Sequence, residues 1–232
     1  MTAAGCDGAC APAASVPGWL RDLAAAAGQM TVPAGLRPPA NGGRHSAILI
    51  LFAARASGPD VLIVQRSRTL RRHAGQPAFP GGVIDPEDDG PVGAALREAQ
   101  EETGVDPAGV DVVSVLPDLY ISRTGYRVSP VLAWWREPAP VAPGDPAEVE
   151  SVARVAVADL ADPGRRLMIS YPSGQPGPAF TAGEMLIWGF TAFVIDRLLA
   201  LGGWERPWDA TKVVDPPPGM AVTGVDGASP VS

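Results

Sequence analysis

The chain has 232 residues, of which 46% are hydrophobic and 19% are charged, and its net charge is −7. This apolar content is enough for a packed core, and the length predicts a single domain. The negative charge argues against a general nucleic-acid binder, which needs a basic surface. No apolar run approaches the ~18 residues of a membrane helix, and the N-terminus lacks the basic and apolar regions of a secretory signal. A cytoplasmic protein without a membrane partner is therefore expected.

The two ends of the chain differ in composition from the middle. Residues 1–15 are rich in alanine and contain both cysteines, and residues 213–232 are rich in proline, glycine and valine. These segments lack the apolar periodicity that docks a segment on a core. We expect a disordered leader over 1–15, one folded domain over 16–212 and a disordered tail over 213–232. The two cysteines alone are too few ligands for a zinc site.

The middle of the chain alternates between strand-like and helix-like patterns. Strands are expected over 46–53, 61–65, 110–116, 127–135, 152–157 and 184–188, and helices over 19–27, 91–103 and 191–201. A turn over 58–60 separates the first two strands, and a proline-rich loop over 138–146 precedes the fifth. Pro91 suits the first turn of its helix and Gly104 suits its end. Strands before and after helices predict a mixed α/β sandwich.

Three glutamates share one face of the predicted helix 91–103. Glu98, Glu101 and Glu102 are related as i, i+3 and i+4, so their side chains fall within a sector of about 100°. Like charges at this spacing repel one another, and a divalent cation reverses that effect. Clustered carboxylates suit Mg²⁺ or Mn²⁺. Taken alone, however, the pattern is more typical of a solvated acidic helix face, so the neighbouring sequence is needed to choose between that face and a metal site.

That context is a glycine pair and an acidic loop upstream of the helix. Residues 97–105, REAQEETGV, resemble the second half of the Nudix box, G-x5-E-x7-R-E-U-x-E-E-x-G-U, where U is aliphatic. The first acidic position departs from the box: it is Asp88 counting forward from Gly82, and Asp89 counting back from Arg97. The loop is thus one residue longer than in the box, which leaves the role of this first carboxylate open.

The resemblance to the Nudix superfamily implies a fold and a division of roles. The fold is a Nudix-type α/β/α sandwich with a mixed β-sheet and a catalytic loop-helix-loop. Glu98, Glu101 and Glu102 would bind the metal, together with the carbonyl group of Gly82. Arg97 would orient the helix against the loop by pairing with an acidic residue. One late-loop carboxylate, for which Glu148 is a candidate, would complete the site.

A second motif lies directly upstream. Residues 62–82, LIVQRSRTLRRHAGQPAFPGG, resemble the signature of coenzyme A pyrophosphatases within this superfamily, L-L-T-x-R-[SA]-x3-R-x3-G-x3-F-P-G-G. Every spacing is kept, with Ile63 in place of a leucine and Val64 in place of the threonine. Four of the seven residues 66–72 are arginines, and guanidinium groups suit the phosphates of coenzyme A. The residues expected to contact substrate are Arg66, Arg71, Gly75, Phe79 and Gly81.

The combined patterns predict a metal-dependent hydrolase of a pyrophosphate linkage. The substrate implied is coenzyme A, the products are 4′-phosphopantetheine and adenosine 3′,5′-bisphosphate, and the cofactor is Mg²⁺ or Mn²⁺. A carboxylate takes the proton from the attacking water, and Glu98, Glu101, Glu148 and Glu150 all remain candidates. The alternatives are a hydrolase of ADP-ribose or dinucleotides, a non-catalytic nucleotide sensor, and a scaffold protein with an acidic helix. The sequence also leaves a homodimer open.

Overall fold

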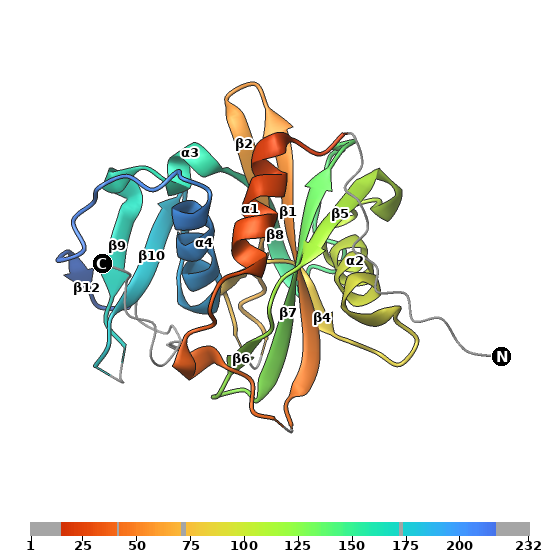
Figure 1. Ribbon diagram of the computed structural model, residues 1–232, viewed down its shortest axis with the longest axis horizontal. Coiled ribbons are helices and arrows are strands. Elements are labelled where there is room, and N and C mark those ends of the chain that lie inside the picture. Colours follow the sequence, from red (N-terminus) through yellow and green to blue (C-terminus); the bar gives the residue numbers. More distant parts are fainter. Residues whose placement is uncertain (1–14, 41, 71–72, 172–173, 217–232) are drawn as a thin grey trace.

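The computed structural model describes residues 15–40, 42–70, 73–171 and 174–216. Most of the predicted leader, with both cysteines, and the tail from residue 217 lie outside the described residues. The rest of the chain forms a large mixed sheet with helices on both faces and a smaller sheet at one side (Figure 1). Within the described part of the chain, no helix is long and apolar enough to cross a membrane.

The large sheet is built around two long parallel strands. β1 (Arg44–Arg55) pairs in parallel with β7 (Tyr126–Trp135), and β2 (Gly58–Arg66) pairs antiparallel on the other side of β1. The strand order is β3-β2-β1-β7-β5, with β4 also paired to β1, β6 to β7 and β8 to β2. The remaining strands are β3 (Pro77–Ala78), β4 (Gly81–Val83), β5 (Val110–Val115), β6 (Leu119–Ile121) and β8 (Val149–Ala156).

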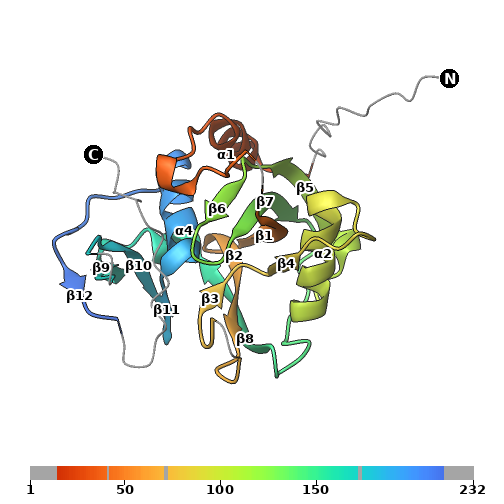
Figure 2. The same ribbon diagram turned by 90° about the horizontal axis from the view of Figure 1, so that it is seen from below.

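Helices cover both faces of this sheet, as Figures 1 and 2 show. On one face, α2 (Gly90–Thr103) packs over Leu49 and Leu51 of β1. On the other face, α1 (Gly18–Gly28) and α4 (Gly189–Leu201) pack over Ile50 and Phe52. Because β1 is buried on both faces, its sequence is a continuous apolar run instead of an alternating one. The predicted α/β/α sandwich with a mixed sheet is confirmed.

A second, four-stranded sheet lies against α4 on the side away from the large sheet (Figure 1). Its order is β11-β10-β9-β12. The strands are β9 (Arg166–Ile169), β10 (Gly177–Ala182), β11 (Met185–Ile187) and β12 (Val213–Val214). Only β11 was predicted, because β9 and β10 are short and contain arginine, glycine and proline. β12 pairs in parallel with β9, which corrects the predicted start of the tail at residue 213.

The other differences from the predicted elements are local. The turn predicted over 58–60 lies earlier, because Arg55 already pairs with Gly58 and residues 58–60 belong to β2. The strand predicted over 152–157 begins at Val149, and its last residue opens the short helix α3 (Val157–Leu160). Within the described ranges, three short 3-10 helices join the main elements: η1 (Ala34–Leu36), η2 (Pro107–Gly109) and η3 (Pro163–Arg165).

Candidate active site

The helix that carries the glutamates, α2, begins and ends as its sequence predicts. Pro91 lies in the first turn, where its missing N–H costs no hydrogen bond. Gly104 ends the helix in the left-handed conformation, with φ of 74°, and donates its N–H to the carbonyl of Gln100 at 2.9 Å. β4 lies beside α2, and in the chain it stands between Arg66, at the end of β2, and this helix (Figure 2).

The three glutamates of α2 have different surroundings. The Glu102 side chain is 7% exposed, Glu98 is 19% exposed and Glu101 is 59% exposed. Glu102 accepts a hydrogen bond from the backbone N–H of Gly81 at 3.1 Å. Glu98 lies against Gly82. Two of the three carboxylates therefore face β4, and the third faces solvent.

Close approach explains the glycine pair at the start of β4. A Cβ atom on Gly81 would overlap the carbonyl oxygen of Ala47 and lie 2.7 Å from Cα of Ile48, both backbone atoms of β1. A Cβ atom on Gly82 would collide with the Glu98 carboxylate. Glycine at both positions lets β4 pass between β1 and α2, and it places two backbone peptides next to the carboxylates.

Arg97 clamps α2 to the loop before it. Its Nε and Nη2 each donate to one carboxylate oxygen of Asp88, both at 2.9 Å, and Nη2 also donates to the carbonyl of Val83 at 3.2 Å. Its Nη1 donates to Glu98 at 3.0 Å and to Glu101 at 3.2 Å. These hydrogen bonds lower the pKa of Asp88 to about 2. The arginine thus fixes the loop and two glutamates at once.

The partner of Arg97 resolves the ambiguity in the first half of the box. Asp88, which lies at the forward count from Gly82, occupies the paired position. Asp89 precedes the helix and its side chain makes no capping hydrogen bond. The extra residue of the loop therefore falls between Asp88 and the arginine. Asp88 was not among the expected site residues, although the forward count from Gly82 identifies it.

The buried carboxylates are poorly suited to carry charge without a cation. Burial raises the pKa of Glu102 to about 7, against the opposing effects of the Gly81 N–H and the Arg66 guanidinium. Burial also raises the pKa of Glu98, and Arg97 opposes that shift. The negative charge of Glu98 further raises the pKa of Glu102. Both glutamates would gain from a cation placed beside them.

The carboxylates of this site fit a cation whose other ligands are water and substrate phosphate. Within the described ranges, no three acidic, histidine or cysteine side chains are already grouped to hold a metal. The Glu101 side chain is 59% exposed, so Glu98 and Glu102 are the two donors that are largely removed from solvent. Mg²⁺ is usually bound by one or two protein carboxylates, with water and substrate phosphate completing its shell. The pair of glutamates matches that mode of binding.

The raised pKa of Glu102 predicts how stability changes with pH. Burial disfavours the charged form of Glu102, so the folded protein is most stable relative to the unfolded chain below the usual pKa of 4.5. This stability is lost as the pH rises through about 7, because the carboxyl group must then ionise in the fold. When a chelator keeps the protein free of metal, the melting temperature should therefore fall between pH 5 and pH 8. The loss in the free energy of unfolding should be about 3 kcal/mol at most. Glu102→Gln should flatten this profile. An equally steep fall in the variant would show that Glu102 is not the group responsible.

Arg66 approaches the carboxylates from the end of β2, and Glu148 approaches them from the turn just before β8. Nη1 of Arg66 lies 3.8 Å from Oε1 of Glu102, and the buried Nε of Arg66 has no hydrogen-bond partner among the described residues. Arg66 pairs in register with Val149, the residue after Glu148. The negative charge of Glu148 contributes to the raised pKa of Glu102. Strand pairing thus brings together three residues that are far apart in the sequence.

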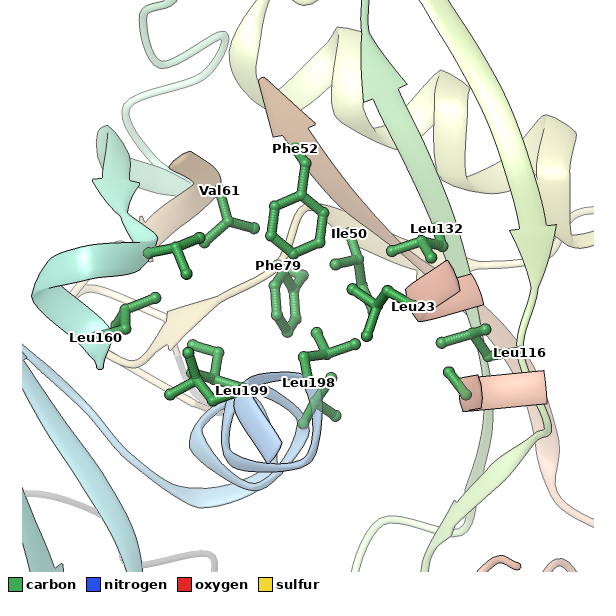
Figure 3. Packing of buried hydrophobic residues seen from close by; sticks show 14 of the residues in the cluster. Leu23, Ile50, Phe52, Val61, Phe79, Leu116, Leu132, Leu160, Leu198 and Leu199 are labelled. Atoms are coloured by element: carbon green, nitrogen blue, oxygen red, sulfur yellow. The ribbon is translucent and has the colours of Figure 1, made fainter. Parts of the chain in front are cut away.

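The other residues expected to contact substrate have different positions. The structure corrects the expectation for Phe79: its side chain is 3% exposed and packs in the core between Phe52 and Leu198, not at the surface (Figure 3). Gly75 follows the arginine-rich segment, residues 66–72, and donates its N–H to the carbonyl of Ser67 at 3.3 Å. Arg71 lies outside the described residues.

The structure thus places a glutamate helix, clamped by an arginine, beside a glycine pair on a mixed α/β sandwich. The NUDIX domain model matches residues 43–171, so the chain belongs to the Nudix family. It is 38% identical over 167 residues to "Uncharacterized Nudix hydrolase NudL" of Escherichia coli (strain K12), covering 71% of this chain and 85% of the relative. These findings confirm the predicted enzyme class, a Nudix pyrophosphohydrolase.

Two further likenesses have narrower coverage. A protein of the same name from Citrobacter koseri is 47% identical over 100 residues, which are 42% of this chain and about half, 52%, of the relative. Among solved structures, the crystal structure of a Nudix hydrolase from M. smegmatis, RenU, matches with a TM-score of 0.44 and 26% identity. That match covers 53% of this chain and 76% of the other.

Proposed function

We propose that this protein hydrolyses the pyrophosphate linkage of coenzyme A or one of its derivatives, giving 4′-phosphopantetheine and adenosine 3′,5′-bisphosphate. The observation that carries the proposal is the position of Arg66. This arginine belongs to the segment that resembles the coenzyme A signature, and its guanidinium lies beside the buried carboxylate of Glu102. Its Nε has no hydrogen-bond partner among the residues that the structure describes, and a guanidinium in this position is suited to bind a phosphate oxygen of the substrate.

Nudix hydrolases generally use divalent metal ions, and we propose Mg²⁺ or Mn²⁺ here. Glu98 and Glu102 would hold the ion with the carbonyl of Gly82, and the exposed Glu101 would complete the acidic face. When bound, the cation supplies positive charge that neutralises the phosphate oxygens and eases deprotonation of the attacking water. Arg97 keeps Glu98 oriented through its hydrogen bond at 3.0 Å.

Among the candidates for the general base, the contacts favour Glu148. Glu98 and Glu101 accept hydrogen bonds from Arg97, and Glu150 pairs with Arg68 at 3.3 Å. Glu148 is exposed and forms no ion pair within the described part of the chain. It also lies near enough to Glu102 to affect that group electrostatically. We propose that Glu148 is the general base, which accepts the proton of the attacking water.

The test of substrate is a comparison of coenzyme A with 3′-dephospho-coenzyme A. Both contain the pyrophosphate, so they differ only in the 3′-phosphate that the arginine-rich segment would bind. Charge-assisted hydrogen bonds to a phosphate predict a kcat/KM that favours coenzyme A by about 10-fold or more. Arg66→Ala and Arg71→Ala should each shrink this preference. Arg136→Ala is the matched control, since Arg136 pairs with Asp111 on β5.

Equal kcat/KM values for the two substrates would contradict the assignment of coenzyme A. In that case the arginines would not recognise the 3′-phosphate, and a broader nucleotide pyrophosphatase would be the better description. The comparison leaves the metal chemistry unaffected, because the bond that breaks is the same in both substrates. Glu98→Gln should accordingly lower both rates without changing their ratio.

A further inference from the structure

The proline-rich loop before β8 docks on the C-terminal end of α2. Ala142 donates its N–H to the carbonyl of Thr103 at 3.2 Å, and Gly144 donates its N–H to the carbonyl of Glu102 at 3.1 Å. The last carbonyls of a helix have no partner within the helix. The loop supplies those partners, so it is attached directly to the turn of α2 that carries Glu101 and Glu102.

The attachment at Gly144 requires a glycine for steric reasons. A Cβ atom at this position would lie 3.0 Å from the carbonyl carbon of Glu101 and would overlap the carbonyl oxygen. Both atoms belong to the backbone of α2, which cannot move aside as the end of a flexible side chain could. A larger residue at position 144 would therefore push the loop away from the helix.

The other end of the same loop is attached to Ser67, the residue that follows β2. Asp145 accepts hydrogen bonds at its backbone carbonyl from the N–H groups of Glu148, at 3.0 Å, and Val149, at 2.9 Å. The side chain of Asp145 accepts one from Ala147 at 2.8 Å. The backbone carbonyl of Glu148 then accepts from the N–H of Ser67 at 2.8 Å. A short, internally hydrogen-bonded turn thus separates the contact at Gly144 from Glu148.

We propose that Gly144 is a positioning residue, whose contact with the end of α2 holds the Glu148 carboxylate beside Glu102. The loop links the metal-binding helix on one side to the Arg66 end of β2 on the other. A shift of the loop at Gly144 moves Glu148 relative to the buried glutamates while leaving those glutamates in place. This inference rests on the proposed function, in which Glu148 takes the proton from water.

The experiment is a double-mutant cycle of Gly144→Ala with Glu148→Gln. Activity is measured with Mg²⁺ on both coenzyme A and ADP-ribose, together with the melting temperature of each variant. Displacement of a reacting group by about 1 Å can cost up to 100-fold, so we expect Gly144→Ala to lower kcat by about 10- to 100-fold. Gly28→Ala is the matched control, because a Cβ atom at Gly28 would meet nothing within 4 Å.

The cycle separates positioning from a general loss of structure. If Gly144 acts through Glu148, Gly144→Ala should have little further effect on kcat in the Glu148→Gln background. Additive losses of kcat, or a Gly144→Ala variant within about 2-fold of wild type, would overturn the proposal. Ala142→Pro removes the donor to Thr103 without adding a side chain at position 144, and it serves if Gly144→Ala does not fold.

The outcome is also distinguishable from a failure of the proposed function. Glu98→Gln tests the metal site without involving the loop. If Glu98→Gln abolishes hydrolysis while Glu148→Gln and Gly144→Ala do not affect it, the positioning role is wrong and the hydrolase assignment stands. If Glu98→Gln has no effect, the proposed catalytic site itself is wrong.

Discussion

Replacing Glu98 or Glu102 of α2 by glutamine is expected to lower kcat by at least about 100-fold, because each replacement removes a charge that would hold the proposed cation. Glu98 and Glu102 are the two carboxylates that face β4, with 19% and 7% of their side chains exposed. The measurement is steady-state kinetics at saturating Mg²⁺.

The fold should survive these two replacements. Burial disfavours the charged form of Glu102 and raises its pKa to about 7, so a neutral glutamine relieves that cost in the metal-free protein. The melting temperature of Glu102→Gln without metal should match or exceed that of the wild type at pH 8. Glu137→Gln is the control, because Glu137 has an exposed side chain that pairs with Arg136. A variant with wild-type activity at saturating Mg²⁺ would contradict the assignment.

Arg97→Lys is expected to lower kcat by about 10- to 100-fold even though it keeps the positive charge. Lysine cannot reproduce the fork that binds both oxygens of Asp88 and reaches Glu98 at the same time. The loop and the glutamates would lose their common anchor, so the loss should appear in kcat at saturating substrate.

The matched control for this arginine is Arg136→Lys, since Arg136 also pairs with an aspartate, Asp111, but on β5. Its kcat should stay within about 2-fold of the wild type. Equal effects of the two replacements would indicate a general effect of arginine loss. A fully active Arg97→Lys enzyme would show that the clamp on Asp88 is not required.

The sequence predicts the sandwich and the glutamate helix well because both depend on local signals. The apolar run of β1, Pro91 at the start of α2 and Gly104 at its end are each visible within a short window. The position of Arg97 follows from helical geometry, and its contact with an acidic loop residue was predicted as well. Counting alone could not choose between Asp88 and Asp89, because one inserted residue shifts the two counts.

Features that depend on long-range packing were harder to predict. The small sheet is built from short strands whose pattern is weak, and its pairing involves segments as distant as β9 and β12. Phe79 belongs to a motif associated with substrate, yet its large apolar side chain fills the core. The approach of Glu148 to Glu102 depends on the pairing of β2 with β8 and on the docking of Gly144, which no local pattern shows.

We propose that this Nudix protein cleaves the pyrophosphate of coenzyme A with a cation held by the carboxylates of α2. The most direct test incubates wild-type and Glu98→Gln protein with coenzyme A, ADP-ribose and a dinucleotide, with Mg²⁺ or Mn²⁺, and identifies the products by mass spectrometry. The wild-type protein should form 4′-phosphopantetheine and adenosine 3′,5′-bisphosphate from coenzyme A, and Glu98→Gln should form little of either product. Faster hydrolysis of ADP-ribose or the dinucleotide than of coenzyme A, or equal product from both proteins, would contradict it.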